Sequence, residues 1–343
     1  MADNLRELIE EGIVKIAEKP RMNSIDLEEI SSLDAYTVPL IDHDYPAGTP
    51  RMWNSVYTEL GLNIRNIMVI ANPKNIKKIF DAFKKDKKYL GGGAGSGFKD
   101  TSVPYLDRLS ENAQRIGSIN LIVKESSKLI GYNTDGIGYV NGLEEEFGSE
   151  TIRNKKIVVL GAGGVTPSIV YHLLDKKPLD LVIINRTIPK AERIVQDMKK
   201  FFTDSKISIR FGGEDRIREE ISKADIVINT SNKGTEGQLS KYSAFATTTE
   251  ENIPNANGLF NKGTEAYKNI LSLNPHSIVS DINIREGLTT TLRVAKAYGT
   301  KRIQDGLPMV FHQAVPAFIL SHKNIIISEG ELEKIMSKAI FGN

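Results

Sequence analysis

The stretch KKIVVLGAGGVTPSIVYHLLDKKPLDLVIINRTIPK, residues 155–190, decides the fold of this chain. It begins with an unbroken apolar run at 157–160, which is typical of a strand buried on both faces of a parallel sheet. The run leads into a turn that contains Gly161, Gly163 and Gly164. Glycines in such a turn can take positive φ and let another group come close to the backbone. The stretch therefore begins as a strand that turns tightly on glycine.

The rest of the stretch completes a strand–turn–helix–strand unit. Apolar periodicity predicts a helix at 165–174, and a second apolar run predicts a strand at 181–184. A helix N-terminus that follows a glycine turn binds phosphate, so the unit resembles a dinucleotide site. It departs from the G-x-G-x-x-G pattern because Thr166 occupies the third glycine position, followed by Pro167. The alternative is a plain βαβ crossover with a glycine turn.

The end of the second strand indicates which dinucleotide would bind. Sites for NAD usually carry Asp or Glu about 20 residues past the glycines, where it accepts from the ribose 2′-hydroxyl. Here that place holds Asn185 and Arg186, and Lys190 follows closely. Two cations suit a 2′-phosphate, so the sequence predicts NADP rather than NAD. The alternative is that Arg186 is only a solvated residue at a strand end.

The composition is that of an ordinary globular protein, with 40% hydrophobic and 26% charged residues among 343. This length predicts two domains. A net charge of +2 gives no electrostatic case for nucleic acid, and no apolar run approaches the ~18 residues that cross a bilayer. The absence of cysteine excludes disulfides and thiolate chemistry and makes a cytoplasmic location the expectation. Five scattered histidines without i, i+4 pairing predict no metal site.

Strands and helices alternate along the rest of the chain, which predicts a doubly wound parallel sheet. Apolar residues between Leu5 and Ile16 are spaced for one face of an N-terminal helix. The segment 91–97 is too rich in glycine for the interior of an element, so we predict a loop that brings backbone close to another group. Strands are predicted at 36–41, 66–71, 118–123, 129–132, 207–210, 226–229 and 277–282, and helices at 51–60, 75–87, 106–116, 135–147, 289–298, 307–320 and 329–340.

Three groups of motifs together resemble the shikimate/quinate dehydrogenase family. The glycine turn with the NRT ending of the second strand is similar to the family's NADP fingerprint. IGSIN at 116–120 with GYNTDG at 131–136 resembles its substrate-loop signature, and DGLPM at 305–309 with QAVPAF at 313–318 resembles its C-terminal helix motif. The resemblance covers residues 35–325, and its order and spacing are far more specific than the glycine turn alone.

The resemblance implies a catalytic pair at Lys99 and Asp135. Reducing a ketone requires a hydride from a nicotinamide cofactor and a proton for the developing alkoxide. A lysine can deliver that proton, while a nearby carboxylate orients the lysine and binds a neighbouring hydroxyl. Without the family motifs, a surface lysine and a helix cap would be the favoured interpretation of these two residues.

The substrate contacts of the family carry over only in part. The resemblance implies that Asn120 and Gln313 bind ring hydroxyls, and Thr49 stands where the family has a carboxylate-binding serine. Ala47 replaces the other such serine, and Ile284 occupies the place of a substrate tyrosine. The catalytic end of the site is therefore intact, whereas the carboxylate end is altered.

The segment before Lys99 is altered as well, because Gly93 and Gly95 replace the Asn and Thr of the family's N-V-T-x-P-x-K motif. Each lost donor removes a charge-assisted hydrogen bond worth roughly 1.5–3 kcal/mol. Shikimate would therefore bind weakly unless Arg51 or Arg285 substitutes, and we count Arg285 among the predicted substrate-binding residues. We predict a related cyclic hydroxy or keto substrate whose carboxylate is displaced, modified or absent.

The predicted fold is α/β with two domains. A Rossmann-type NADP-binding domain is expected at 137–304 and a discontinuous α/β substrate-binding domain at 34–136 and 305–343, after an N-terminal helical extension at 1–33. The predicted partner is a small cyclic hydroxy or keto substrate rather than nucleic acid or a membrane, and the sequence leaves a homodimer open. The predicted cofactor-binding residues are Gly161, Ala162, Gly163, Gly164, Val165, Asn185, Arg186, Thr187, Lys190, Thr230, Ser231, Gly306 and Met309.

Two other functions compete with an NADP-dependent oxidoreductase. An enzyme of the folate methylene dehydrogenase type has a similar two-domain plan, but the NTDG motif and Gln313 fit it poorly. A dinucleotide-binding regulator that has lost catalysis is the other alternative, and the altered segment at 91–97 is the best evidence for it. Retention of Lys99 together with Asp135 argues against the regulator.

Overall fold

The computed structural model describes residues 4–203, 206–235 and 237–342. The chain divides into two compact units. Unit 1 consists of Met1–Gly138 with Val310–Asn343, and unit 2 is Tyr139–Met309. Two helices, α6 (Asp135–Phe147) and α12 (Leu307–Ser321), carry the chain from one unit to the other. The boundaries between the units therefore fall inside helices rather than in loops.

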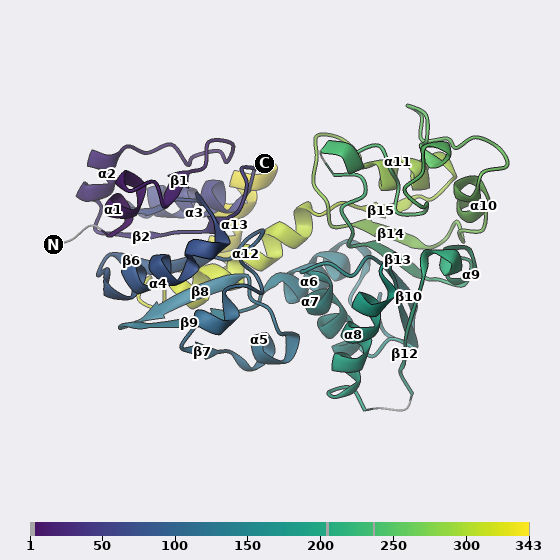
Figure 1. The fold of residues 1–343 in the computed structure, drawn as a ribbon, viewed down its shortest axis with the longest axis horizontal. Coiled ribbons are helices and arrows are strands. Elements are labelled where there is room, and N and C mark those ends of the chain that lie inside the picture. Colours follow the sequence, from purple (N-terminus) through teal and green to yellow (C-terminus); the bar gives the residue numbers. More distant parts are fainter. Residues whose placement is uncertain (1–3, 204–205, 236, 343) are drawn as a thin grey trace. The chain divides into compact units, whose positions relative to one another are not determined.

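Unit 2 alternates strands and helices along the chain (Figure 1). Its strands are β10 (Lys156–Leu160), β11 (Asp180–Ile184), β12 (Ser208–Gly212), β13 (Ile226–Asn229), β14 (Ile278–Asp281) and β15 (Arg302–Gln304). Its own α-helices are α7 (Thr166–Asp175), α8 (Ile188–Lys199), α9 (Ile217–Ile221), α10 (Glu265–Leu271) and α11 (Thr290–Ala297). The sequence pattern predicts all of these strands except β15.

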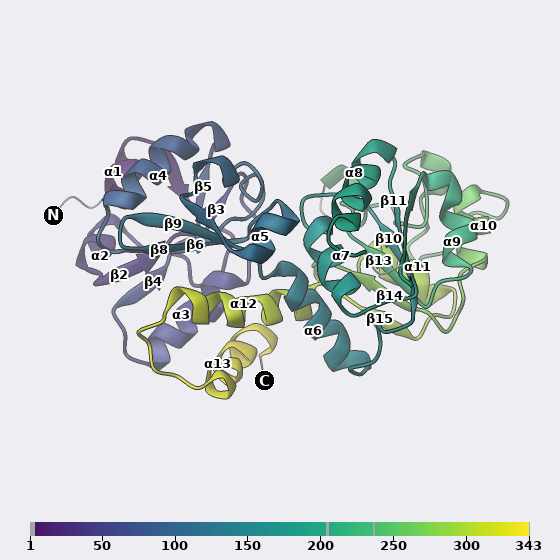
Figure 2. The same ribbon diagram turned by 90° about the horizontal axis from the view of Figure 1, so that it is seen from below.

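The six strands of unit 2 form one parallel sheet in the order β12-β11-β10-β13-β14-β15. Figure 2 shows α7 and α8 on one face and α9, α10 and α11 on the other. All of β13 and the last four residues of β10 are buried, as apolar runs in a sheet covered on both faces must be. The predicted Rossmann-type fold is confirmed, and the strand order reverses between β10 and β13, where such sheets bind ligands at the carboxyl ends of the strands.

Unit 1 is built on two mixed sheets. Its strands are β1 (Val14–Ile16), β2 (Ala35–Thr37), β3 (Leu40–Ile41), β4 (Ile64–Asn66), β5 (Val69–Ala71), β6 (Tyr89–Gly93), β7 (Arg108–Leu109), β8 (Leu121–Glu125) and β9 (Lys128–Tyr132). Besides its parts of α6 and α12, its helices are α1 (Asn4–Glu10), α2 (Leu27–Ser32), α3 (Thr49–Glu59), α4 (Ile76–Lys85), α5 (Glu111–Ile116) and α13 (Glu329–Phe341). The larger sheet has the order β4-β2-β6-β8-β9-β7, and the smaller one has the order β1-β5-β3.

Helices cover both faces of the larger sheet of unit 1. In Figure 2, α1 and α4 lie on one side, and α3, α12 and α13 lie on the other. The side with α4 buries the apolar stripe that contains Ile79, Phe80 and Phe83. On the other side, Trp53 of α3 packs edge-on against Phe318 of α12, with ring centroids 5.3 Å apart. These two cores fix the helices from which the candidate site is built.

The N-terminal segment differs from the single helix that its apolar spacing predicts. Helix α1 ends at Glu10, Gly12 takes a φ of +69°, and β1 then pairs antiparallel with β5. The helix predicted from Leu5 to Ile16 is therefore wrong after Glu10, because a distant strand partner overrides the local helical periodicity. Leu5 and Ile30 of the same segment are fully buried in the core of unit 1.

Two apolar runs predicted as single strands are each divided between the two sheets. The run at 36–41 gives β2 in the larger sheet and β3 in the smaller one, and the run at 66–71 gives β4 and β5 in the same way. The predicted helix at 106–116 begins only at Glu111, because the Ser110 side chain caps it by accepting from the Ala113 amide. Residues before that cap form β7.

The glycine-rich segment at 91–97 is a loop only in its second half. Gly91 and Gly93 belong to β6, which lies between β2 and β8. A Cβ on Gly91 would lie 2.2 Å from the Ile122 carbonyl oxygen, so glycine lets these two strands approach. The predicted loop is therefore wrong for these residues, but the close backbone approach that we inferred from the glycines is confirmed. Among the described residues, no helix is long and apolar enough to cross a bilayer.

Candidate active site

Lys99 and Asp135 form an ion pair in unit 1. Lys99 lies in the turn after β6, and its Nζ donates to Oδ2 of Asp135, the first residue of α6. The Ile119 amide donates to the Lys99 carbonyl at 2.8 Å, which fixes the backbone of that turn. The lysine side chain is 24% exposed, whereas the aspartate side chain is 8% exposed. A small molecule can therefore reach the ammonium, while its carboxylate partner stays buried.

Asn120 connects this pair to its surroundings. Its Nδ2 donates to the other carboxylate oxygen of Asp135 at 2.9 Å, to Thr134 Oγ1 at 2.9 Å and to Gln313 Oε1 at 3.1 Å. Its Oδ1 accepts from the Thr134 amide at 2.8 Å. Both oxygens of Asp135 are thus engaged, one by Lys99 and the other by Asn120. This network fixes the carboxylate in one orientation toward the lysine.

Gln313 reaches Asn120 because α6 and α12 cross closely. A Cβ on Gly138 of α6 would lie only 2.6 Å from the Gln313 amide nitrogen, so the crossing requires glycine there. The Gln313 Nε2 donates to the Val310 carbonyl at 3.1 Å, which leaves its Oε1 directed to Asn120. Four predicted residues, Lys99, Asp135, Asn120 and Gln313, therefore meet in one cluster.

Thr134 lies within the NTDG motif but is not among the site residues that the sequence predicts. Its hydroxyl lies within 2.9 Å of Asn120 Nδ2, and its amide binds the same side chain. Another residue of the motif fixes the backbone of Asp135, because the Asp135 amide donates to Asn133 Oδ1 at 3.1 Å. The signal was present, since these residues are consecutive in the motif, but only the contacts show that Thr134 orients Asn120.

Two predicted substrate-binding residues, Thr49 and Arg285, form no hydrogen bond or ion pair with the cluster around Lys99 and Asp135 in the part of the chain that the structure describes. Thr49 is half-buried in the first turn of α3, and no hydrogen bond between described residues links it to Lys99 or Asp135. Arg285 is exposed on the loop after β14 in unit 2, in the same loop as Ile284. For these two residues, binding to a substrate stays a prediction.

The glycine turn of unit 2 is shaped by the end of β13. Gly161 has a φ of +126°, and a Cβ on it would lie 2.7 Å from the Ser231 amide nitrogen and 2.9 Å from Thr230 Oγ1. Gly163 and Gly164 are exposed, and a Cβ on Gly164 would have no neighbour within 4 Å. Gly161 is therefore required by packing, whereas Gly164 leaves open space beside the backbone.

The structure also explains the departure from the usual glycine fingerprint at Thr166. This residue begins α7, is fully buried, and shares a 2.9 Å hydrogen bond between its Oγ1 and that of Thr230. A threonine therefore bonds to the end of β13 at the position where the third glycine usually allows close packing. No side chain caps the N-terminus of α7, so its amides remain available to an anion such as a pyrophosphate.

The predicted 2′-phosphate cations follow β11. Arg186 and Lys190 are both exposed, and neither forms an ion pair with any other residue that the structure describes. Asn185 donates from its Nδ2 to the Thr187 carbonyl at 2.9 Å, which holds the turn into α8. Two unpaired cations beside this turn fit an anionic group on the cofactor ribose.

The remaining predicted cofactor residues also lie in unit 2. Gly306 precedes α12, and a Cβ on it would lie 2.0 Å from the Ile282 carbonyl oxygen. Met309 is buried and Ser231 is half-buried. Ala162 and Val165 line the glycine turn and are half-buried. No group of three or more potential metal-ligating side chains occurs among the residues the structure describes.

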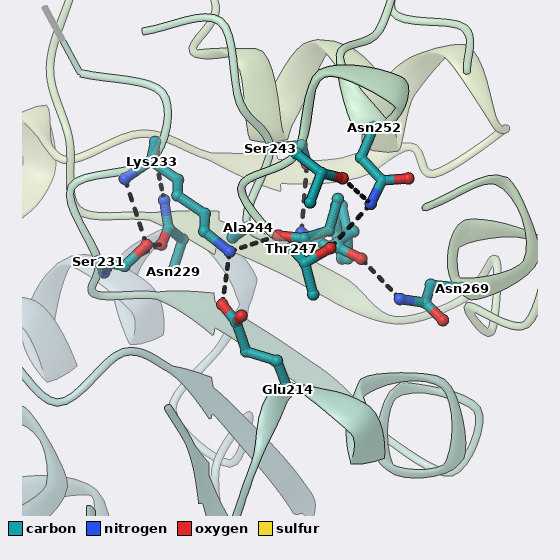
Figure 3. Close-up of polar contacts among 12 residues, drawn as sticks. Glu214, Asn229, Ser231, Lys233, Ser243, Ala244, Thr247, Asn252 and Asn269 are labelled. Carbon is teal, nitrogen blue, oxygen red and sulfur yellow. Dashed lines mark hydrogen bonds and ion pairs between the residues drawn. The ribbon is translucent and has the colours of Figure 1, made fainter. Parts of the chain in front are cut away.

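A buried polar network supports the segment that carries Thr230 and Ser231 (Figure 3). Lys233 Nζ donates to Glu214 Oε1 at 2.6 Å and to the Ala246 carbonyl. The Lys233 side chain is only 11% exposed, and its carbonyl accepts from Asn229 Nδ2 at 2.9 Å. Losing one partner of such a pair typically costs about 3–5 kcal/mol, because the other charge stays buried. Sequence reasoning did not single out Lys233.

Asp281, at the end of β14, belongs to the same network. Its carboxylate accepts from Asn229 Nδ2 at 3.0 Å, from the Asn283 amide at 3.1 Å and from Thr289 Oγ1 at 2.6 Å. Burial nevertheless dominates and raises the pKa of Asp281 to about 6. The folded protein therefore disfavours the ionised form of this carboxyl more than the unfolded chain does.

Replacing Asp281 with asparagine is expected to stabilise the protein above neutral pH. The pKa of Asp281 is higher in the folded protein than in the unfolded chain. The contribution of Asp281 to the free energy of unfolding is therefore fully present below about pH 4 and is lost as pH rises through about 6. The loss at pH 7 is on the order of 3 kcal/mol. Thermal unfolding of both proteins from pH 4 to pH 8 checks this expectation. A difference in Tm that does not change with pH would contradict it.

The parallel sheet with its glycine turn and the separate lysine–aspartate cluster define the chain as an oxidoreductase of the dinucleotide-dependent class. The family profile described as Shikimate / quinate 5-dehydrogenase matches residues 143–247. The profile described as Shikimate dehydrogenase substrate binding domain matches residues 46–122. The chain belongs to the shikimate/quinate dehydrogenase family, as its motifs predict.

Individual relatives agree with this assignment. An NADP(+) shikimate dehydrogenase from Alkaliphilus metalliredigens is 31% identical over 276 residues, which cover 79% of this chain and 86% of the relative. A crystal structure of a shikimate dehydrogenase in complex with NADP+ superposes with a TM-score of 0.71 at 24% identity, covering 94% of this chain and 99% of the other. The ligand-free 5-ketofructose reductase of a Gluconobacter strain shares the fold, with a TM-score of 0.67 at 22% identity over 88% of this chain and 98% of the other.

Proposed function

We propose that this chain is an NADP-dependent dehydrogenase that interconverts a ring ketone and a ring alcohol of a shikimate-like substrate. The observation that carries the proposal is the cluster of Lys99, Asp135, Asn120 and Gln313 in a member of this family. The open glycine turn, the uncapped N-terminus of α7 and the exposed Arg186 and Lys190 support NADP as the cofactor. When bound, NADPH supplies the hydride that reduces the carbonyl carbon.

Lys99 is the proton donor in this proposal. Its Nζ gives a proton to the carbonyl oxygen as negative charge develops there, so the products are the alcohol and the oxidised cofactor. In the reverse direction, the neutral amine of Lys99 accepts the proton of the alcohol. Asp135 holds the lysine in place and accepts from a neighbouring substrate hydroxyl. Asn120 and Gln313 bind a further hydroxyl through their amide groups.

The carboxylate end of the proposed site differs from that of ordinary members. Ala47 has no hydroxyl to donate, and Ile284 is 46% exposed and apolar where the family has a tyrosine. Thr49, Arg51 and Arg285 are the remaining candidates for binding an acid group. We therefore propose a substrate whose carboxylate is displaced, modified or absent. The family assignment argues against a folate methylene dehydrogenase.

The test is NADPH oxidation with a panel of cyclic ketones, with NADH in parallel. The panel contains 3-dehydroshikimate, 3-dehydroquinate and analogues in which the carboxylate is removed, reduced or replaced by an amine. We expect turnover of at least one analogue with NADPH preferred over NADH, and poor turnover of 3-dehydroshikimate. Efficient use of 3-dehydroshikimate would refute the proposal that the substrate carboxylate is displaced, modified or absent. Tight NADPH binding without turnover of any ketone would instead favour the regulator.

Three further properties stay predictions. The division into an N-terminal extension and two domains is checked by limited proteolysis followed by mass spectrometry of the fragments. The homodimer is checked by light scattering during gel filtration, and the cytoplasmic location by cell fractionation. None of these outcomes changes the proposed chemistry.

A further inference from the structure

The loop between β3 and α3 brings Tyr45 to the glycine segment that precedes Lys99. A Cβ on Gly95 would lie 3.0 Å from the Tyr45 hydroxyl and 2.7 Å from Ile41 Cγ2. The contact with Ile41 is closer than real Cβ atoms show and the contact with the Tyr45 hydroxyl is closer than most, so a side chain at residue 95 would require both neighbours to shift. The Tyr45 hydroxyl therefore lies beside the point where a side chain on residue 95 would begin.

Gly93 provides the contrast within the same segment. A Cβ there would come no closer than 3.4 Å to any neighbouring atom, the nearest being Pro39 Cβ. A side chain therefore fits at 93 without moving a neighbour, whereas at 95 it would displace Ile41 and Tyr45. The family pattern described above has a polar side chain at both positions. Only at Gly95 does another polar group, the Tyr45 hydroxyl, lie beside the place of the lost side chain.

The surroundings of the Tyr45 phenol define what it can bind. Burial, and then the negative charges of Asp135 and Asp42, raise the pKa of the phenol to about 12, so it stays protonated and neutral. The backbone of Ser96 opposes this rise in pKa only weakly. Among the described residues, no acceptor takes the Tyr45 O–H. The phenol therefore has one hydrogen to donate, in the field of the two carboxylates that raise its pKa.

The N-terminal segment holds the loop that carries Tyr45. The Asp44 carboxylate accepts from the backbone amides of Glu18 at 3.1 Å and Lys19 at 3.2 Å. The Tyr45 ring packs against a small apolar cluster of Ala17, Ile41 and Met68, and lies 5.5 Å from the His43 ring between centroids. The position of Tyr45 is thus fixed by residues 17–19, which precede the part of the chain that the substrate-domain profile matches.

We propose that Tyr45 is a specificity-determining residue that donates its phenol hydrogen to an uncharged hydroxyl of the substrate, at the end of the site where residue 95 has lost its side chain. The inference rests on the proposed dehydrogenase function. A hydroxyl can accept from Tyr45 and donate to a carboxylate, whereas a carboxylate on the substrate would be repelled by Asp42, since Asp135 is already paired with Lys99. The geometry thus favours a hydroxymethyl or ring hydroxyl over an acid group.

The test compares Tyr45→Phe with the unaltered enzyme on two ketones, 3-dehydroshikimate and its analogue with the carboxylate reduced to hydroxymethyl. The unaltered enzyme is expected to prefer the hydroxymethyl ketone. The substitution removes one hydrogen bond, so kcat/KM for that ketone should fall by about 10-fold, mainly through KM. Activity on 3-dehydroshikimate, Kd for NADPH and Tm should stay close to those of the unaltered enzyme. Tyr105→Phe, at an exposed tyrosine of the same unit, is the matched control.

A second variant tests the steric part of the proposal. Gly95→Ala should lower Tm by several degrees, whereas Gly93→Ala should not, and adding Tyr45→Ala to Gly95→Ala should recover part of the loss. Equal effects of Tyr45→Phe on both ketones would overturn the inference and leave the proposed function intact. A preference for 3-dehydroshikimate in the unaltered enzyme would overturn the inference together with the proposed change of substrate, and would leave the proposed ketone–alcohol chemistry intact. Failure of the unaltered enzyme on every ketone would overturn both.

Discussion

Replacing Lys99 with alanine is expected to lower kcat by about 10²–10⁴-fold on the best ketone of the panel. The substitution removes the group that delivers the proton, while Asp135 keeps its bond from Asn120 and the fold of unit 1 is retained. Kd for NADPH should not change, because every predicted cofactor-binding residue lies in unit 2. Stopped-flow measurement of NADPH oxidation together with NADPH titration checks both parts of the expectation.

Two companion variants make this result specific. Lys87→Ala removes an exposed lysine of the same unit and should leave kcat unchanged. Asp135→Asn should lower kcat as well, and the double variant with Lys99→Ala should lose little more than Lys99→Ala alone, because the pair acts as one unit. Near-normal turnover by Lys99→Ala would refute the catalytic assignment and favour the interpretation as a surface lysine beside a helix cap.

Replacing Gly161 with alanine is expected to destabilise unit 2 and to abolish tight NADPH binding. The new Cβ would lie 2.7 Å from the Ser231 amide nitrogen, at a backbone φ of +126° that side chains rarely adopt. Strain of this kind and overpacking against backbone together cost on the order of 3 kcal/mol. Thermal unfolding and NADPH titration measure the two effects.

Gly164→Ala is the matched variant in the same turn. A Cβ on Gly164 has no neighbour within 4 Å, so Tm should stay unchanged. The added methyl would still crowd a pyrophosphate on this exposed backbone, so the affinity for NADPH should fall. If Gly161→Ala unfolds at the same temperature as the unaltered protein, the packing that we assign to this turn is wrong.

The sequence was most informative where the structure depends on neighbours along the chain. The apolar runs of β10 and β11, the glycine turn and the periodic α7 each carry their own local pattern, and the structure places them within one or two residues of the prediction. The same holds for α6, whose predicted limits at 135–147 coincide with the observed helix. Local propensity and burial agree in these elements, so the pattern predicts them.

Local patterns failed where a distant partner decides the conformation. The run at 36–41 is apolar throughout, but its two halves pair with different sheets, and nothing in the run itself marks that division. Residues 14–16 continue a helical periodicity and yet form β1, because β5 offers an antiparallel edge. In both cases the tertiary contact outweighs the local preference.

The candidate site shows the same limit more sharply. The sequence by itself determined the fold class, the dinucleotide turn and, through the family motifs, the identity of Lys99 and Asp135 as candidates. Only the tertiary structure decided that Asn120 and Gln313, 193 residues apart, share a hydrogen bond, and that the Tyr45 hydroxyl lies beside Gly95. Periodicity and turn chemistry report on the nearest few residues, whereas a site is made by side chains that only the packing of separate elements brings together.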